Sequence, residues 1–307
     1  MAWALAGCAG PRPASTQAVF TELAAGTYLH RGLLEDWGPA NLGDVADTGL
    51  VIGSRCAAVI DTGGTLATGR KLAAAVRRLT DKPVCWVIAT HAHPDHVLGH
   101  QAFVEAAVVD GQPPPVIVGH ARLPAALAVR GPYYLNALKR DFGPALAEQT
   151  ALLPPTLSVQ ATLELDLGGR VLELKAWPTA HTDADLSVFD RASGTLFVGD
   201  LLFVDHTPVI DGRLKGWLAA MDDMQTWPVK IAVPGHGPPS PDWPGVLAPQ
   251  RRYLEGLRSD VRAAIKEGLT LRQAVERIAP DRADWQLLDV FHARNVTAAY
   301  AELEWDE

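Results

Sequence analysis

One short segment of the chain combines three histidines and an aspartate within six residues, in Thr90-His91-Ala92-His93-Pro94-Asp95-His96. Side chains alternate on an extended backbone, so His91 and His93 project to the same side and can share one metal ion. Pro94 interrupts the extension, which points Asp95 and His96 elsewhere. Zinc accepts imidazole and carboxylate donors, and iron or manganese is the alternative. The segment therefore predicts ligands for two neighbouring metal ions rather than one closed structural zinc site.

The elements before this segment change from strands to a helix and back. Residues 19–31 break at Gly26 like a hairpin, and residues 48–61 predict a second hairpin. Residues 66–79 carry apolar side chains on one face and basic ones on the other, which predicts an amphipathic helix. A continuous apolar run over residues 84–89 predicts a strand buried on both faces, directly before the histidines.

The alternation of strand and helix continues to about residue 245. Further strands are predicted over residues 116–118, 163–167, 171–176, 186–189, 196–198 and 231–233, and helices over residues 133–148 and 214–224. From residue 246 the pattern is helical, with a stop at Gly268 and helices over residues 270–278 and 287–303. We predict one α/β domain over residues 18–245 and a C-terminal helical extension, residues 246–307, packed on it.

Composition limits the class of protein. The 307 residues are 48% hydrophobic and 20% charged, which suffices for a sizeable core. A formal net charge of −8 provides no basic surface for phosphates, so we expect a small-molecule substrate and no nucleic-acid partner. Uncharged apolar runs of about 18 residues are absent from the sequence, so no transmembrane segment is predicted.

The first residues resemble the end of a bacterial lipoprotein signal. Leu5-Ala6-Gly7-Cys8 matches a lipobox, and residues 1–17 are predicted to be a truncated signal and linker with a lipid anchor at Cys8. The segment departs from an ordinary signal because no Lys or Arg precedes it. We expect a periplasmic or membrane-anchored protein, with a cytoplasmic location as the alternative. Cys56 and Cys85 lie in apolar runs and are predicted to be unpaired, with no disulfide.

The pattern His-x-His-x-Asp-His after a strand resembles the signature of the metallo-β-lactamase superfamily, over residues 18–240. The resemblance implies a four-layer αββα sandwich. It also implies that His181 completes the first metal site, that Asp200 bridges both ions, and that His236 completes the second site with Asp95 and His96. His181 is predicted to follow a strand, and Asp200 and His236 are each predicted to close one.

Three further residues belong to the predicted site. Asp61 matches a family aspartate that supports the ligand loop, where it would accept the free N–H of a metal-bound imidazole; an ordinary turn residue is the alternative. His120 and His206 follow strands near the expected cleft and are candidate substrate contacts.

The resemblance implies a hydrolase with two zinc ions per chain, in which Asp95 and Asp200 belong to the catalytic centre. Metal-bound hydroxide would attack an ester, thioester, lactone or amide. True metallo-β-lactamases generally lack a bridging aspartate, so β-lactam hydrolysis is a weaker alternative. A second is an oxidoreductase similar to persulfide dioxygenases, with one iron on the two histidines and the aspartate of the first site. A third is a non-catalytic metal-binding accessory protein.

Four further segments resemble zinc metallohydrolases linked to sulfur oxidation (SoxH-like) and to quinoprotein relay systems. They are Asn41-Leu42-Gly43-Asp44, residues 181–186, residues 199–203 and residues 295–304. This similarity implies partners in a periplasmic redox system.

Overall fold

The computed structural model of the chain describes residues 19–280 and 284–306. Within these residues the strands form two sheets, ordered β1-β2-β3-β4-β5-β6-β7 and β12-β11-β10-β9-β8. The predicted signal and the lipid anchor at Cys8 lie outside the described residues. Among the described residues, no helix combines the length and the hydropathy that a membrane span requires.

The seven-stranded sheet is antiparallel from β1 to β4 and parallel from β4 to β7. Its strands are β1 (Thr21–Ala24), β2 (Thr27–His30), β3 (Thr48–Ile52), β4 (Ala57–Ile60), β5 (Val84–Ile88), β6 (Val116–His120) and β7 (Leu157–Val159). In the five-stranded sheet β11 and β12 pair in parallel and the other pairs are antiparallel. Its strands are β8 (Thr162–Asp166), β9 (Val171–Ala176), β10 (Leu186–Asp190), β11 (Thr195–Phe203) and β12 (Ile231–His236).

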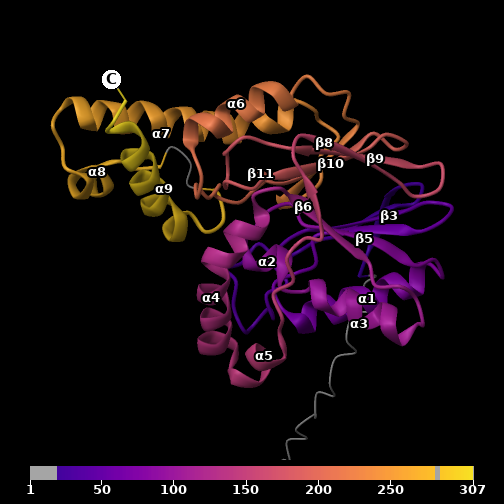
Figure 1. The fold of residues 1–307 in the computed structure, drawn as a ribbon. Helices are drawn as coiled ribbons and strands as arrows, with labels where there is room; N and C mark the ends of the chain where they lie inside the picture. Colours follow the sequence, from indigo (N-terminus) through magenta and orange to yellow (C-terminus); the bar gives the residue numbers. More distant parts are fainter. Residues whose placement is uncertain (1–18, 281–283, 307) are drawn as a thin grey trace, which may run out of the picture.

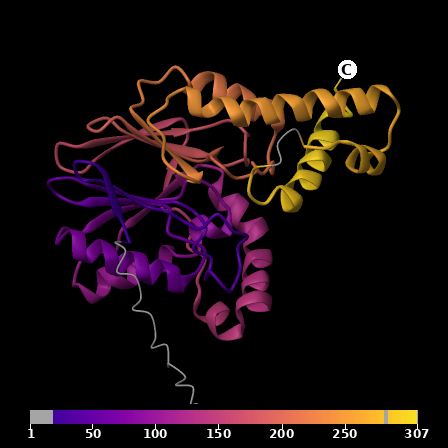
Figure 2. The same cartoon turned by 180° about the vertical axis from the view of Figure 1, so that it is seen from behind.

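The helices cover the outer faces of the two stacked sheets, which makes the predicted four-layer αββα sandwich (Figure 1). The helical segments are α1 (Leu66–Leu79), α2 (Pro94–Val97), α3 (His100–Val109), α4 (Leu123–Phe142), α5 (Pro144–Gln149), α6 (Leu214–Met224), η1 (Gly245–Leu247), α7 (Ala248–Lys266), α8 (Leu271–Arg277) and α9 (Leu288–Leu303). Helices α1 and α3 lie under the seven-stranded sheet and α6 lies over the other. Figure 2 shows α7 to α9 extending beyond the sandwich at one end.

Three clusters of buried apolar side chains pack the layers of the sandwich against one another. One fills the space between the sheets, with Ile60, Ile88 and Val188 among its members. A second packs α1 and α3 on the outer face of the seven-stranded sheet. The third joins α6 and β11 to the C-terminal helices, through Trp217 and Leu254 among others. The C-terminal helices therefore share a core with the second sheet.

Most predicted elements are confirmed, with one helix misplaced. The helices predicted over residues 66–79 and 214–224 have those bounds, and both N-terminal hairpins are present. The prediction of a single helix over residues 133–148 is wrong at both ends. Helix α4 begins at Leu123 and runs through Pro132, and Gly143, with a φ of 94°, separates it from α5. This positive φ suits glycine and ends the helix.

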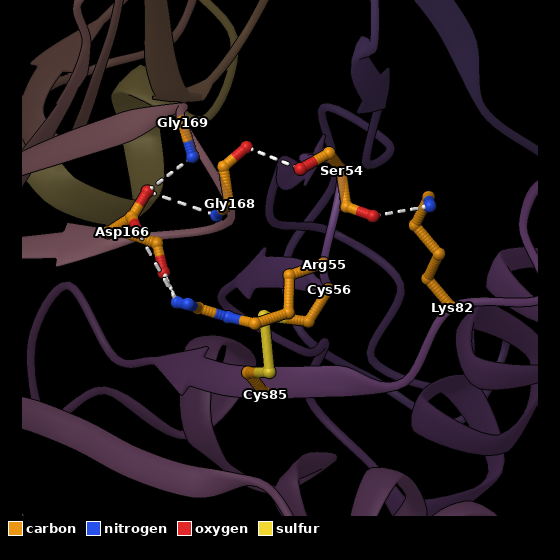
Figure 3. The surroundings of a disulfide bond; sticks show 8 residues. All are labelled: Ser54, Arg55, Cys56, Lys82, Cys85, Asp166, Gly168 and Gly169. Carbon is orange, nitrogen blue, oxygen red and sulfur yellow. Dashed lines mark hydrogen bonds and ion pairs between the residues drawn. A yellow bond between two sulfur atoms is a disulfide. The ribbon is translucent and has the colours of Figure 1, made fainter.

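The prediction that Cys56 and Cys85 are unpaired is wrong. They form a disulfide between the beginnings of β4 and β5, with their Cα atoms 5.8 Å apart (Figure 3). Beside it, Ser54 Oγ donates to Gly168 O at 2.6 Å, which ties the β3–β4 turn to the β8–β9 turn of the other sheet. Each cysteine by itself fits an apolar strand, and only the parallel pairing of β4 with β5 brings the two together.

Candidate metal centre

All seven predicted metal ligands lie near one edge of the sandwich. His91 and His93 follow β5, and Asp95 and His96 lie on the short helix α2, which begins at Pro94. His181 lies in the loop between β9 and β10, and His236 is the last residue of β12. Figure 1 places α2 at this edge, beside α4.

The position predicted for Asp200 needs one correction, because this residue lies within β11 and does not close it. The register of β11 against β12 shifts at Gly199, which has a φ of 56°. A Cβ at this position would press on the side chain of Thr90. This irregularity re-aims the strand, so Asp200 faces the ligand loop although the strand continues to Phe203.

The first donor group consists of His91, His93, His181 and Asp200. Nδ1 of His93 lies 3.1 Å from Nε2 of His181. Oδ2 of Asp200 lies 3.3 Å from the same nitrogen and 3.6 Å from Nε2 of His91. A tetrahedral zinc with bonds of about 2.0–2.1 Å separates its ligand atoms by about 3.3 Å, so these spacings fit one ion.

The second donor group consists of Asp95, His96 and His236. Nε2 of His236 lies 3.3 Å from Oδ2 of Asp95, and Nε2 of His96 lies 3.5 Å from that oxygen. The other oxygen of Asp200, Oδ1, lies 3.2 Å from His96 and 3.5 Å from His236. Asp200 therefore offers one oxygen to each group.

Three of these donor atoms are buried and have no hydrogen-bond partner within the described residues: His91 Nε2, His96 Nε2 and Asp200 Oδ1. Leaving a buried polar atom unpaired costs about 1–3 kcal/mol. Metal ions at the two groups would satisfy all three atoms. The donor set, its spacing and its unpaired atoms thus fit a pair of divalent ions.

In each of the five histidine ligands, the ring nitrogen that points away from the donor group makes a hydrogen bond. His91 Nδ1 meets Thr90 Oγ1 at 3.0 Å, and His181 Nδ1 meets the carbonyl of Val209 at 2.6 Å. His236 Nδ1 meets the carbonyl of Val45 at 2.9 Å. His96 and His93 instead meet carboxylates, Asp61 at 2.7 Å and Asp211 at 2.9 Å. Such partners fix the orientation and tautomer of metal-binding imidazoles.

The two groups differ in their electrostatics. Burial lowers the pKa of His181 to about 3 and also lowers that of His91, so both rings are neutral and free to bind a cation. Burial acts against the charged form of His236 as well, but Asp200 and Asp95 raise its pKa to about 10. A metal ion entering the second group must therefore displace a proton.

A cavity of about 640 Å³ opens onto both groups. Its wall includes Arg130 and Tyr133 from α4, and Phe291 and Arg294 from α9. The candidate contact His206 lines it, whereas His120 is not among the lining residues and accepts a hydrogen bond from the backbone N–H of Arg122. A substrate contact by His206 stays a prediction.

Two residues that line the cavity, Asp211 and Arg130, were not predicted from the sequence. Asp211 follows no strand closely and belongs to no motif. Arg130 lies in the part of α4 that the sequence did not predict to be helical. No signal in the sequence links Asp211 to His93, because the two residues are 118 positions apart.

Comparisons with known proteins agree with this geometry. Residues 42–236 match the metallo-beta-lactamase superfamily. A linear primary-alkylsulfatase from Pseudomonas sp. (strain ATCC 19151) is 22% identical over 72% of this chain and 47% of its own. A solved stereoselective inverting sec-alkylsulfatase from Pseudomonas sp. superposes with a TM-score of 0.68, at 17% identity, over 94% of this chain and 50% of that one.

The chain thus spans about half the length of these alkylsulfatases. A metallo-beta-lactamase family protein from Thermus thermophilus is matched over 92% of this chain and 94% of its own, with a TM-score of 0.65 at 20% identity. The structural matches show the fold, and the family match covers more than half of the chain, from before the histidine segment to His236. The chain belongs to the metallo-beta-lactamase superfamily.

Proposed function

We propose that the protein is a hydrolase that holds two zinc ions and cleaves an ester bond of a small molecule. The observation that carries this is the position of Asp200, whose two oxygens face two complete donor groups at the base of one cavity. A purely structural zinc site is closed by four ligands and needs neither a shared carboxylate nor an adjoining cavity.

Zinc ions bound here would lower the pKa of water and polarise the substrate oxygen that develops negative charge. His91, His93 and His181 would hold one ion, and Asp95, His96 and His236 the other, with Asp200 between them. The protein supplies ligand rings of fixed orientation, because the ring nitrogens that point away from the donor groups make hydrogen bonds. It also supplies an apolar wall, through Phe203 and Phe291, that shelters the bond to be cleaved.

Sulfate esters of alkyl alcohols are the first substrates to test, because two of the similar proteins are named alkylsulfatases. Carboxylic esters, thioesters, lactones, amides and β-lactams complete the set. The rival is an oxidoreductase with one iron at the first group. The second group favours the hydrolase because Asp95, His96 and His236 lie close enough together to hold a second ion, which a one-iron enzyme does not need.

Metal content of the purified chain, measured by mass spectrometry together with this substrate panel, tests the proposal. We expect about two zinc ions per chain and hydrolysis of at least one ester. D200A should bind zinc about 100-fold more weakly or worse, and turnover should fall with it. Removing a shared ligand should cost at least as much as removing a side chain that only supports a ligand. D141N changes a carboxylate of the same cavity that touches no ligand and should behave like the wild type. One iron per chain with oxygen uptake, or two zinc ions without ester hydrolysis, would contradict the proposal.

We also propose that the protein functions in an oxidising compartment such as the periplasm. The Cys56–Cys85 disulfide supports this, because disulfides persist outside the reducing cytosol. Alkylation of free thiols in lysed cells tests it, since Cys56 and Cys85 should resist modification until a reductant is added. Labelling of both residues without reductant would refute it.

A further inference from the structure

The partner of His93 differs from those of the other ligand rings. Nε2 of His93 meets Oδ2 of Asp211 at 2.9 Å, so its Nδ1 faces His181 and the first donor group. The carboxylate that serves His96 in the same way is Asp61, which is 2% exposed. The Asp211 side chain is 29% exposed and lines the cavity. The support of His93 is therefore part of the surface that a substrate meets.

Asp211 is fixed from two directions. Its backbone N–H donates to the carbonyl of His181 at 3.0 Å, which joins it to a second ligand of the same group. Its carboxylate forms an ion pair with Arg130, which comes from α4 and is 32% exposed. Arg130 has further N–H donors that this ion pair does not use, and it lines the same cavity.

We propose that Asp211 is a positioning residue for His93, and that the Arg130–Asp211 ion pair links the α4 wall of the cavity to the first metal group. The carboxylate accepts a hydrogen bond from the Nε2–H of His93, which leaves the lone pair of Nδ1 for the ion. The ion pair with Arg130 holds the carboxylate turned toward the ring. An intact Arg130–Asp211 pair strengthens metal binding at the first donor group. An anionic group of a substrate that draws Arg130 away from Asp211 would weaken the support that Asp211 gives to His93.

This inference rests on the proposed function, since it assumes a metal ion at the first group. Removing a carboxylate that supports a ligand histidine weakens metal binding by about 10- to 100-fold. Removing Arg130 leaves the hydrogen bond to His93 in place, so its effect on metal binding should be smaller. Both effects should fall on one of the two ions, because the second group has its own support in Asp61.

Zinc binding to the full chain, stripped with a chelator and titrated against a fluorescent competitor, tests the inference. We expect D211A to weaken one of two zinc affinities by about 10- to 100-fold, D211N to weaken it less, and R130M to weaken it by about 3- to 10-fold. R140M is the matched control, since it removes another arginine of the same cavity that pairs with Asp141 and contacts no ligand. Its zinc affinities should equal those of the wild type.

Steady-state kinetics with the best ester substrate distinguish the role of Asp211, which positions His93, from that of Arg130, which also faces the substrate. D211A at saturating zinc should lower kcat, whereas R130M should raise KM more than it lowers kcat. Unchanged zinc affinities in D211A and D211N, while the wild type binds two ions, would overturn the inference and leave the proposed function intact. A wild type that binds fewer than two ions would instead overturn the proposed function. If D211A does not fold, the zinc affinities of D211N provide the test, because asparagine has nearly the size and shape of aspartate.

Discussion

Asp61 illustrates how one side chain holds the ligand loop. Its carboxylate accepts hydrogen bonds from the backbone N–H of Thr90 at 2.8 Å and from the Thr90 hydroxyl at 2.7 Å, and it meets His96 Nδ1 at 2.7 Å. Asp61 adopts a φ of 59°, a left-handed conformation that costs a non-glycine residue about 1 kcal/mol. These contacts compensate for that cost and fix the loop before any ion binds.

A second buried carboxylate, Asp190, holds the two sheets together. It lies at the end of β10 and accepts hydrogen bonds from Arg170 Nε at 3.1 Å and from Thr27 Oγ1 of β2 at 3.0 Å. Arg170 also donates to the carbonyl of Ile52 at 3.1 Å. Burial raises the pKa of Asp190, but the bonds from Arg170, Ser193 and Thr27 outweigh it and lower the pKa below its ordinary value.

The lowered pKa sets a pH dependence for stability. A carboxyl group with a depressed pKa stabilises the folded state above its unfolded pKa of about 3.9, and this contribution is lost as the pH falls through the folded value. We expect D190N to reduce the free energy of unfolding by about 3 kcal/mol at pH 7, and by less at about pH 3. Urea unfolding at both pH values measures this. A difference that grows toward low pH would contradict the assignment.

The close approach of β11 to β12 places two of the metal ligands. Asp200 lies at the irregular register of β11, and Gly235 faces it from β12, one residue before His236. A Cβ at position 235 would collide with Oδ1 of Asp200, the oxygen that faces the second donor group. Glycine is therefore needed here for space, because the backbone must pass directly beside the shared carboxylate.

We expect G235A to displace Asp200 and to reduce bound zinc from about two ions per chain to one or fewer, since Asp200 serves both groups. G256A is the control, because a Cβ there meets nothing within 4 Å and Gly256 lies within helix α7. Alanine in a helix interior should raise the stability of G256A by about 0.5–1 kcal/mol. Metal analysis and thermal unfolding of both variants provide the test. Full zinc content in G235A would refute the role given to Gly235.

The C-terminal helices complete the cavity. Phe203 of β11 stacks on His236 with ring centroids 5.3 Å apart and an interplanar angle of 4°. His206 packs on His236 at 5.0 Å and on Phe291 of α9 at 5.7 Å. This row of rings joins the second donor group to α9, and both α9 and α4 contribute residues to the lining of the cavity.

The disulfide and the metal centre lie toward opposite ends of strand β5. The disulfide joins the beginnings of β4 and β5, and the metal ligands follow the end of β5. The disulfide closes a loop with a sequence separation of 29, and a loop of this length stabilises by about 3.5 kcal/mol through the restricted unfolded chain.

Replacing both cysteines, in C56A/C85A, should therefore lower the free energy of unfolding by about 3.5 kcal/mol while bound zinc stays at about two ions per chain. Urea unfolding and metal analysis measure the two quantities. The wild type in a reducing agent serves as the control and should lose a similar stability. A loss of zinc in the folded variant would show that the two ends of the sandwich are coupled.

Local sequence patterns predicted the four donors of the histidine segment and most of the elements. His91 to His96 are close in the chain, so strand alternation and a proline suffice to divide them between two groups. The distant ligands His181, Asp200 and His236 came from the resemblance to the superfamily. The helices at residues 66–79 and 214–224 follow from local periodicity, which burial on one face imposes directly on the sequence.

The residues that support these ligands are recognisable only in the folded chain. Asp211 and His93 are 118 positions apart, and Arg130 lies 81 positions from Asp211, so no local pattern joins them. The disulfide likewise depends on which strands are neighbours, and the bend at Gly199 depends on the register between β11 and β12. Periodicity reports which face of an element is buried. It carries no information on which distant element lies against that face, because the order of strands and the course of loops determine that contact.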